Sequence, residues 1–179
     1  GSGDVMDISG YGNNGTKGGN ALQTDAGYFG KGFAFDGDDD FVSIPATVIS
    51  GDEFSISWWE YSTGPGAYNG NDGYFFSDSN DAANLFIRRS SGGTGKVIGG
   101  IGDTNAAEIV ALTEQWNYHV INHWSNGTYV WYVNNVLGMT ETGSNFVSLQ
   151  SALYIGNRQD VARDFDGTID EVLIFNRTL

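Results

Sequence analysis

The chain has 179 residues, of which 40% are hydrophobic and 14% aromatic, which is enough to bury a core and excludes wholesale disorder. Its formal net charge is −14, from 8 basic and 22 acidic residues, and a field of that sign makes a nucleic-acid partner unexpected. The absence of cysteine excludes disulfides and thiolate metal sites, and no apolar run is long enough to predict membrane insertion.

Short predicted strands follow one another along the chain. Segment 104–114 has the best helical propensity, but its centre reads equally well as a strand. Turn clusters such as Asp36-Gly37-Asp38 and Ser125-Asn126-Gly127 separate the strands. About a dozen short strands without helices predict an all-β sandwich or barrel. The runs that predict strands are residues 32–35, 41–44, 54–61, 73–77, 84–89, 96–101, 108–112, 116–124, 128–133, 152–155 and 168–175.

Several sequence boxes, in a fixed order, resemble those of bacterial laminin-G-like domains of the concanavalin A-like lectin/glucanase superfamily. The resemblance covers nearly the whole chain and implies a two-sheet antiparallel β-sandwich with jelly-roll topology. In this family a strand usually precedes the first box and a short tail often follows the last. Here these pieces are expected to be either trimmed or supplied by a neighbour, and in either case a sheet edge is left exposed. The boxes are Asp7–Gly15 (D-I-S-G-Y-G-N-N-G), Phe29–Pro45, Phe54–Trp59 (F-S-I-S-W-W), Trp116–Val120, Tyr132–Asn135, Leu153–Asn157 and Phe165–Leu179.

The acidic residues suggest calcium (Ca2+), because 16 of the 22 are Asp and calcium takes six to eight oxygen ligands. By resemblance, Asp170 is expected to be a structural calcium ligand on the last strand. If the two ends of the chain pair, Asp170 comes near Asp7 and Asn13 and near the Asp36-Gly37 turn. The alternative is that Asp7 and Asp36 cap turns through their side chains. Asp38–Asp40 are expected to be solvated charge rather than a second site.

The carboxylates and histidines do not predict an enzyme. The resemblance implies that glucanases of this fold carry a Glu-x-Asp-x-(x)-Glu strand, and this chain has none. Glu60 is the only carboxylate within residues 54–61. His119 and His123 lie about 13 Å apart along an extended strand, which is too far to share one metal ion. No nucleophile-elbow motif is present.

Strand parity separates a core face from an open face. Within residues 54–61, Phe54, Ile56 and Trp58 are expected in the core, with Trp59 outside beside serine hydroxyls. Within residues 116–124, Trp116, Tyr118 and Val120 are assigned to the core side, although Asn122 on that side counts against the assignment. The predicted ligand-binding residues of the open face are Trp59, Tyr61, Arg88, His119, His123 and Tyr132; the alternative for each aromatic residue is ordinary packing.

Two loops offer further binding groups. Residues 62–81 are rich in Tyr, Asn, Asp and Gly, and Tyr68, Asn69 and Asp72 suit recognition of hydroxyl groups. Residues 157–164 carry two arginines and two aspartates. They predict either a guanidinium fork for a carboxylate or, as the favoured interpretation, a salt-bridged loop.

The sequence therefore predicts a single domain over residues 1–179, with Gly1-Ser2-Gly3 interpreted as a cloning scar. The predicted function is that of a calcium-stabilised, non-catalytic, lectin-like carbohydrate-binding module of a larger secreted or cell-surface protein. The expected partner is a glycan or polysaccharide. The alternative is a structural or protein-binding spacer, adhesin or assembly domain whose incomplete edge pairs with a protein partner, and an enzyme is the least favoured reading.

Overall fold

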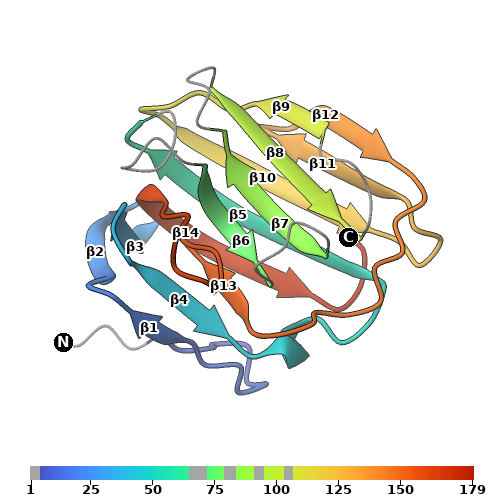
Figure 1. The fold of residues 1–179 in the computed structure, drawn as a ribbon, viewed down its shortest axis with the longest axis horizontal. Coiled ribbons are helices and arrows are strands. Elements are labelled where there is room, and N and C mark those ends of the chain that lie inside the picture. Colours follow the sequence, from blue (N-terminus) through green and yellow to red (C-terminus); the bar gives the residue numbers. More distant parts are fainter. Residues whose placement is uncertain (1–4, 65–71, 79–83, 91–94, 103–106) are drawn as a thin grey trace.

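The protein is a two-layer antiparallel β-sandwich, seen in a computed structural model that describes residues 5–64, 72–78, 84–90, 95–102 and 107–179. Two seven-stranded sheets pack face to face (Figure 1). The described residues contain no α-helix, only a short 3-10 turn at Ala46–Val48. The predicted all-β, jelly-roll type of sandwich is thereby confirmed.

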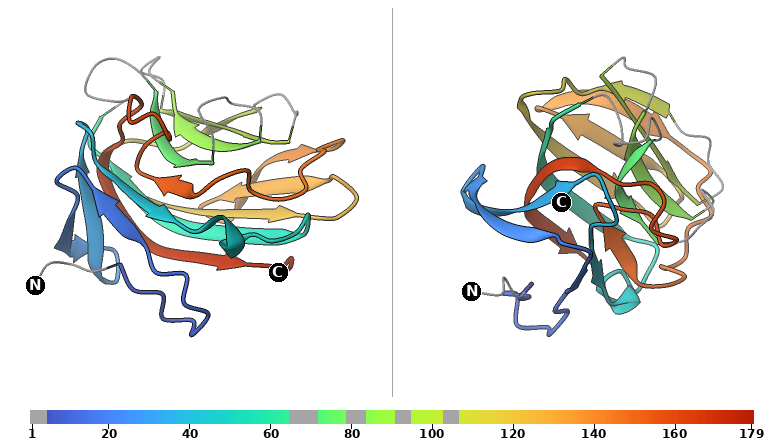
Figure 2. Two further views of the ribbon diagram at one scale, coloured as in Figure 1. Left: turned by 60° about the horizontal axis from the view of Figure 1, so that its bottom comes forward. Right: turned by 60° about the vertical axis from the view of Figure 1, so that its left-hand side comes forward.

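The first sheet has the strand order β1-β4-β13-β6-β7-β8-β9, and the second has the order β12-β11-β10-β5-β14-β3-β2. Figure 2 (left) shows the two layers, with β6, β7 and β8 above β5 and β14. The bounds in the first sheet are β1 Thr16–Gly18, β4 Phe41–Ile44, β13 Leu153–Ile155, β6 Gly73–Ser77, β7 Leu85–Arg89, β8 Lys96–Ile101 and β9 Ala107–Val110. Those in the second are β12 Val136–Glu141, β11 Tyr129–Val133, β10 Trp116–His123, β5 Phe54–Ser62, β14 Asp166–Phe175, β3 Gly30–Asp36 and β2 Leu22–Gly27.

Every predicted strand is present, with ends that differ by at most two residues. Segment 104–114, which sequence left open between helix and strand, contributes strand β9. Three strands were missed, namely β1, β2 and β12. Their sequences TKG, LQTDAG and VLGMTE lack the run of β-branched and aromatic residues on which the prediction relied. These three strands form because they pair with neighbouring strands of the folded chain. Tertiary contacts, rather than the preferences of their own residues, therefore determine them.

The core lies between the sheets and is built by alternate residues of each strand. Phe54, Ile56 and Trp58 on β5 are fully buried, as strand parity predicted. The Trp58 ring packs against Phe75 and Phe76 of β6, with ring centroids 6.1 and 4.9 Å away. Burial of these large rings supplies much of the hydrophobic stabilisation of the sandwich.

A buried ion pair joins the two sheets through the core. Arg89 on β7 donates to Glu60 on β5 at 2.6 Å, and both side chains are almost completely buried. Arg89 also donates to Ser62 Oγ and to the carbonyl of Ala111, both at 2.7 Å, while Asn117 donates to Glu60 at 3.0 Å. Because these partners satisfy the remaining donors and acceptors, the two charges are tolerated in the interior.

Candidate functional site

The outer face of the second sheet carries a cluster of aromatic side chains. On β5, Trp59 and Tyr61 point away from the core and are half-buried, which confirms the predicted side for both residues. Trp116 on β10 lies opposite Tyr61 in the ladder, and Tyr118 lies opposite Trp59. Residues directly opposite in a ladder share a face, so these four rings lie together. The Trp59 and Tyr118 centroids are 4.9 Å apart, and those of Tyr61 and Trp116 are 5.7 Å apart.

The tip of the β2–β3 hairpin completes this cluster. The ring of Tyr28 stacks on Trp59, with centroids 3.5 Å apart and an interplanar angle of 10°. Tyr28 also meets the edge of Trp116 at 5.7 Å and Phe29 at 4.6 Å. Because Tyr28 covers Trp59, the rings most open to solvent are Tyr28 and Phe29, which are 40% and 64% exposed. We call the whole set the aromatic patch; its members are Tyr28, Phe29, Trp59, Tyr61, Trp116 and Tyr118.

Asp170 on β14 holds the hairpin tip in place. Its Oδ2 accepts the backbone N–H of Phe29 at 2.9 Å, and its Oδ1 accepts the N–H of Glu171 at 2.8 Å. A β-bulge in β14 begins at Asp170, and Glu171 has a positive φ of 50°. Gly27 is required beside this carboxylate, because a Cβ there would lie 2.8 Å from Asp170 Oδ2 and 2.6 Å from the backbone N of Gly32.

His119 and His123 are not on the open face, so their predicted place was wrong. In the β5–β10 ladder His119 lies opposite Trp58 and His123 opposite Phe54, both core residues, and the two histidines are 0% and 1% exposed. The parity assignment of β10 was inverted because both of its faces carry aromatic or apolar residues. Asn122, which had counted against the assignment, was the signal that could have corrected it.

Both histidines are held inside as neutral rings. His119 Nδ1 accepts a hydrogen bond from Trp131 Nε1 at 3.2 Å, and its Nε2 lies 3.5 Å from Glu60 Oε1. His123 donates from Nδ1 to the carbonyl of Asp52 at 2.6 Å, and its Nε2 lies 2.9 Å from a serine Oγ. Burial lowers the pKa of both histidines below the ordinary value. Their positions indicate a structural role in the core.

The remaining predicted open-face residues divide between the two sheets. Tyr132 on β11 is half-buried on the outer face of the second sheet, opposite Val120. Arg88 was wrongly grouped with Trp59, because it belongs to β7 in the first sheet, where it forms an ion pair with Asp72. Tyr68 and Asn69 lie outside the described residues.

The predicted calcium ligands do not form one site. Asp7 caps its own turn, with Oδ1 accepting the N–H of Ser9 and Oδ2 that of Asn13, both at 2.8 Å. The carboxamide oxygen of Asn13 faces the hydroxyl of Thr47 at 3.4 Å. This is the turn-capping alternative that the sequence left open for Asp7.

The other predicted ligands are engaged elsewhere. Asp36 Oδ1 accepts the N–H of Asp38 at 3.0 Å across the turn that contains Gly37 (φ 83°), and its Oδ2 accepts from Asn20 at 2.9 Å. Asp170 holds the hairpin as described above. Within the described residues, no three His, Asp or Glu side chains come together in a way that could hold a metal ion. The donor set proposed from sequence therefore does not fit a calcium ion.

The carboxylate that strand parity places on β5 does not reach the aromatic patch. Glu60, the carboxylate that β5 contributes, is fully buried on the inner face. Burial raises its pKa, but the neighbouring His119 and Arg89 together hold that pKa below the ordinary value. Both of its oxygens already accept hydrogen bonds, from Ser62 at 2.6 Å and from Arg89.

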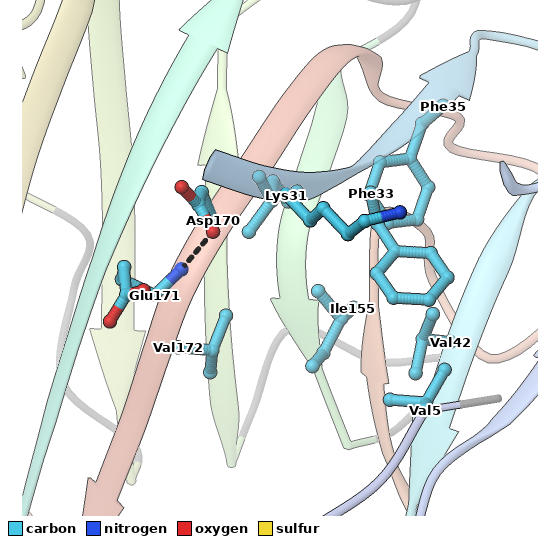
Figure 3. Close-up of a pocket in the computed structure, with 11 residues that line it drawn as sticks. Val5, Lys31, Phe33, Phe35, Val42, Ile155, Asp170, Glu171 and Val172 are labelled. Carbon is cyan, nitrogen blue, oxygen red and sulfur yellow. Dashed lines mark hydrogen bonds between the residues drawn. The ribbon is translucent and has the colours of Figure 1, made fainter. Parts of the chain in front are cut away.

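An apolar cleft of about 150 Å³ opens between the two sheets near Asp170 (Figure 3). Phe33, Phe35, Val42 and Ile155 form much of its wall. It is smaller than the usual 300–1,000 Å³ of ligand pockets. Both oxygens of Asp170 already accept backbone N–H groups. We therefore interpret the cleft as a packing gap, and the aromatic patch is the better candidate for a ligand site.

Comparisons with known families and with solved structures agree on the fold of this chain. A family model described as "Concanavalin A-like lectin/glucanases superfamily" (Laminin_G_3) matches residues 36–179. Comparison with curated proteins found no match. No helix in the described part of the chain is long and apolar enough to cross a membrane.

Several solved structures share the fold at low sequence identity. One is domain 4 of AbnA, an extracellular GH43 arabinanase from Geobacillus stearothermophilus, in complex with arabinotriose: its TM-score is 0.71 at 23% identity, over 98% of this chain and 88% of that chain. The binding domain of botulinum neurotoxin serotype D gives 0.76 at 15% identity, over 97% and 45% of the two chains. The binding domain of Paraclostridial Mosquitocidal Protein 1 gives 0.72 at 14%, over 97% and 46%. This chain thus spans about half of the toxin binding domains, and identities this low establish the fold alone.

Proposed function

The chain belongs to the concanavalin A-like lectin/glucanase superfamily, and we propose that it is a non-catalytic module that binds carbohydrate through the aromatic patch. The module would be part of a larger secreted or cell-surface protein. The observation that carries this proposal is the stack of Tyr28 on Trp59, which presents a flat, partly exposed ring surface on the outer face of the sheet.

Such a surface suits a sugar ring for a physical reason. The face of an aromatic ring is electron-rich, so it attracts the C–H groups that line one side of a pyranose or furanose. Sugar hydroxyls need hydrogen-bonding groups beside that platform. Thr168 on β14, which lies opposite Tyr61 and is half-buried, is a hydroxyl donor and acceptor on the same face.

Two further observations support the proposal. Domain 4 of AbnA, which has the same fold, was solved with a bound arabinotriose, and the toxin structures of this fold are binding domains. The aromatic patch is also held rigidly, because Asp170 ties its hairpin to β14. A rigid platform loses less conformational entropy when a ligand binds.

We propose that the module is not an enzyme. In the described residues, Glu60 is sealed inside the sandwich by Arg89 and Ser62, away from the aromatic patch. Retaining and inverting glycosidases both need a pair of accessible carboxyl groups about 5–9.5 Å apart. A hydrolysis assay on common β-glucans, arabinans and alginates should show no turnover above buffer.

Calcium remains a proposal without a ligand set. It is supported by the excess of Asp over Glu and by the family resemblance, not by the residues first chosen as ligands. A bound calcium would add stability to the folded state by mass action and would supply no chemistry to the ligand site.

A protein partner is the second candidate, favoured by the segment before β1. Met6, Ile8 and Tyr11 are 63%, 95% and 87% exposed, although the Asp7 cap holds this turn in a fixed shape. Exposed apolar side chains on a rigid turn are typical of protein contacts. A glycan array probed in calcium and in chelator separates the candidates: carbohydrate binding supports the leading function, whereas its absence favours the protein-binding alternative.

A further inference from the structure

Beyond the aromatic patch, the outer face of the second sheet carries one more aromatic ring on its way to β12. The strands lie in the order β5-β10-β11-β12, and residues opposite one another in a ladder share a face. Trp59 and Tyr118 of the patch are such partners. The next row of this face, one step further along the strands, contains Ser57, Val120, Tyr132 and Leu137. Tyr132 therefore continues the aromatic surface from the patch toward β12, the edge strand of the sheet.

The rings of this face form a stripe that runs across the strands. Adjacent strands lie about 4.8 Å apart, so β11 lies about 10 Å from β5. Because Tyr132 is opposite Val120, it is a diagonal neighbour of Tyr118, about 7–8 Å away. Tyr28 extends the surface at the other end by stacking on Trp59. We call this set the aromatic stripe; its members are Tyr28, Trp59, Tyr118 and Tyr132. The stripe is longer than a single sugar ring.

The C-terminal tail limits this face along the strands. Ser55 and Asn122 are partners in the β5–β10 ladder, one step beyond the row of Tyr132. Ser55 Oγ donates to the carbonyl of Arg177 at 3.0 Å. Asn122 Oδ1 accepts the N–H of Leu179 at 3.2 Å. The tail therefore contacts β5 and β10 just beyond the row of Tyr132, and an extended ligand on the aromatic stripe lies across the strands rather than along them.

The phenol groups of the stripe are available to a ligand. Tyr118 and Tyr132 are half-buried, and within the described residues neither hydroxyl is hydrogen-bonded to another protein group. A tyrosine hydroxyl both donates and accepts hydrogen bonds. The face of each ring attracts sugar C–H groups, and the hydroxyl at its edge meets sugar hydroxyls. Tyr132 therefore offers the same two recognition groups as the patch, at a distance from Trp59 that one sugar ring does not span.

The aromatic stripe carries no basic side chain, and all eight basic residues of the protein belong to the described part of the chain. Lys31, the one on a strand of the second sheet, pairs with Asp25 of its own hairpin at 3.2 Å. Arg158 pairs with Asp160 in the loop between β13 and β14, which is the salt-bridged loop that the sequence favoured. The others are Lys17, Arg88, Arg89 and Lys96 on strands of the first sheet, Arg163 in the same loop and Arg177 in the tail. With a net charge of −14, the protein repels an acidic polysaccharide and has no cation on the stripe to hold one.

We propose that the aromatic stripe binds the interior of a neutral polysaccharide chain, laid across β5, β10 and β11. This inference rests on the proposed carbohydrate-binding function and adds to it the class of ligand and a second contact point, Tyr132. A chain that contacts Tyr28 and Tyr132 at once gains from both, because the second contact forms within the same complex. Since β12 is the edge of the sheet, no described strand lies beyond it to stop the chain. A short sugar reaches only one end of the stripe.

The test is isothermal titration calorimetry of the full chain with oligosaccharides of two and of six units. The neutral probes are arabino-, xylo-, cello- and manno-oligosaccharides, and the acidic probe is oligogalacturonate of six units. At least one neutral hexasaccharide should bind about tenfold more tightly than its disaccharide, and the acidic probe should not bind. Equal affinity for the two lengths, tighter binding of the acidic probe, or binding of none of the neutral hexasaccharides overturns the proposal.

Variants locate the second contact point. Tyr132→Ala should weaken binding of the neutral hexasaccharide about tenfold and leave binding of the disaccharide unchanged. Retained disaccharide binding also shows that the variant is folded. Tyr28→Ala should weaken binding of both lengths. Tyr154→Ala, at a half-buried ring that packs on Phe41 in the other sheet, is the matched control and should bind like the wild type. A Tyr132→Ala variant that binds the hexasaccharide like this control, or that loses both lengths equally, overturns the proposal.

Failure of this inference is distinct from failure of the proposed function. A disaccharide that binds the wild type but not Tyr28→Ala, with no gain in affinity from six units, overturns the extended ligand and retains carbohydrate binding at the aromatic patch. Absence of binding to every glycan overturns both.

Discussion

The carboxylate of Asp170 accepts the backbone N–H of Phe29 at 2.9 Å, across 141 residues of sequence. This bond joins the last strand to the tip of the first hairpin. The opening and closing segments of the chain are thus connected directly by protein groups at this point. The same bond places Tyr28 over Trp59, and it therefore shapes the aromatic patch.

Asp170→Ala should loosen the hairpin tip. The substitution removes the acceptor of two backbone N–H groups, which costs on the order of 1–3 kcal/mol of unfolding free energy. Hydrogen exchange at the Phe29 amide should become much faster. Asp25→Ala is the control, because Asp25 is an exposed carboxylate of the same hairpin and bonds only to Lys31 across the surface in the described structure. Equal protection of the Phe29 amide in both variants would contradict this role.

Strand parity predicted the two faces of β5 correctly and those of β10 wrongly, for a reason visible in the residues. On β5, serines alternate with large apolar side chains, so only one face can be core. On β10, Trp116 and Tyr118 alternate with His119 and Ile121, and either set could be buried. The pairing register of β10 against β5 determines which face of β10 is buried, because it places His119 opposite the core residue Trp58. Sequence alone does not contain that register.

The aromatic patch was half predicted for a similar reason. Trp59 and Tyr61 follow from the alternation of β5, but Tyr28 and Phe29 come from a hairpin whose first strand, LQTDAG, has no clear strand pattern. Their approach to Trp59 depends on the pairing of β3 with β14 and on the Asp170 contact. The predicted calcium ligands are engaged separately by protein groups: Asp7 and Asp36 accept N–H groups of their own turns, whereas Asp170 accepts those of Glu171 and of the distant Phe29.

Trp58→Ala and Tyr28→Ala should separate stability from surface function. Trp58 is fully buried among core rings, so its removal should cost about 3–5 kcal/mol. Tyr28 is 40% exposed, and its loss should cost about 1 kcal/mol, within the range of ordinary substitutions. Urea unfolding measures both values. A Tyr28→Ala variant that is destabilised as much as Trp58→Ala would mean that the hairpin ring belongs to the core.

Stability should fall as the pH is lowered from about 7.5 to about 6, around the ordinary histidine pKa of about 6.5. Burial lowers the pKa of His119 and of His123, so the unfolded chain binds more protons in this window than the folded one. The stability that the two neutral histidines contribute is fully present above their pKa in the unfolded chain. It is lost as the pH falls toward their lower pKa in the folded protein. Urea unfolding at several pH values measures the slope, and His123→Gln should reduce it. A stability that is constant or rises on acidification across this window would contradict the neutral, buried state of both rings.

Chelation tests the calcium proposal independently of the ligand site. If a calcium ion binds only the folded state, a hundredfold excess over its dissociation constant adds about 2.7 kcal/mol. Chelator should then lower the melting temperature by several degrees, and added calcium should restore it, while magnesium should not. An identical melting curve in calcium and in chelator would exclude a structural calcium ion.

The most direct test of the central claim, that the aromatic patch binds carbohydrate, is one glycan array probed with three proteins. These are the wild type, Tyr28→Ala, and Tyr154→Ala as a matched control, since Tyr154 is a half-buried ring that packs on Phe41 in the other sheet. The account predicts that the wild type and Tyr154→Ala bind the same glycans with similar strength, and that Tyr28→Ala binds them about tenfold more weakly or not at all. A wild-type protein that binds no glycan, or a Tyr28→Ala variant that binds as well as the control, would contradict it.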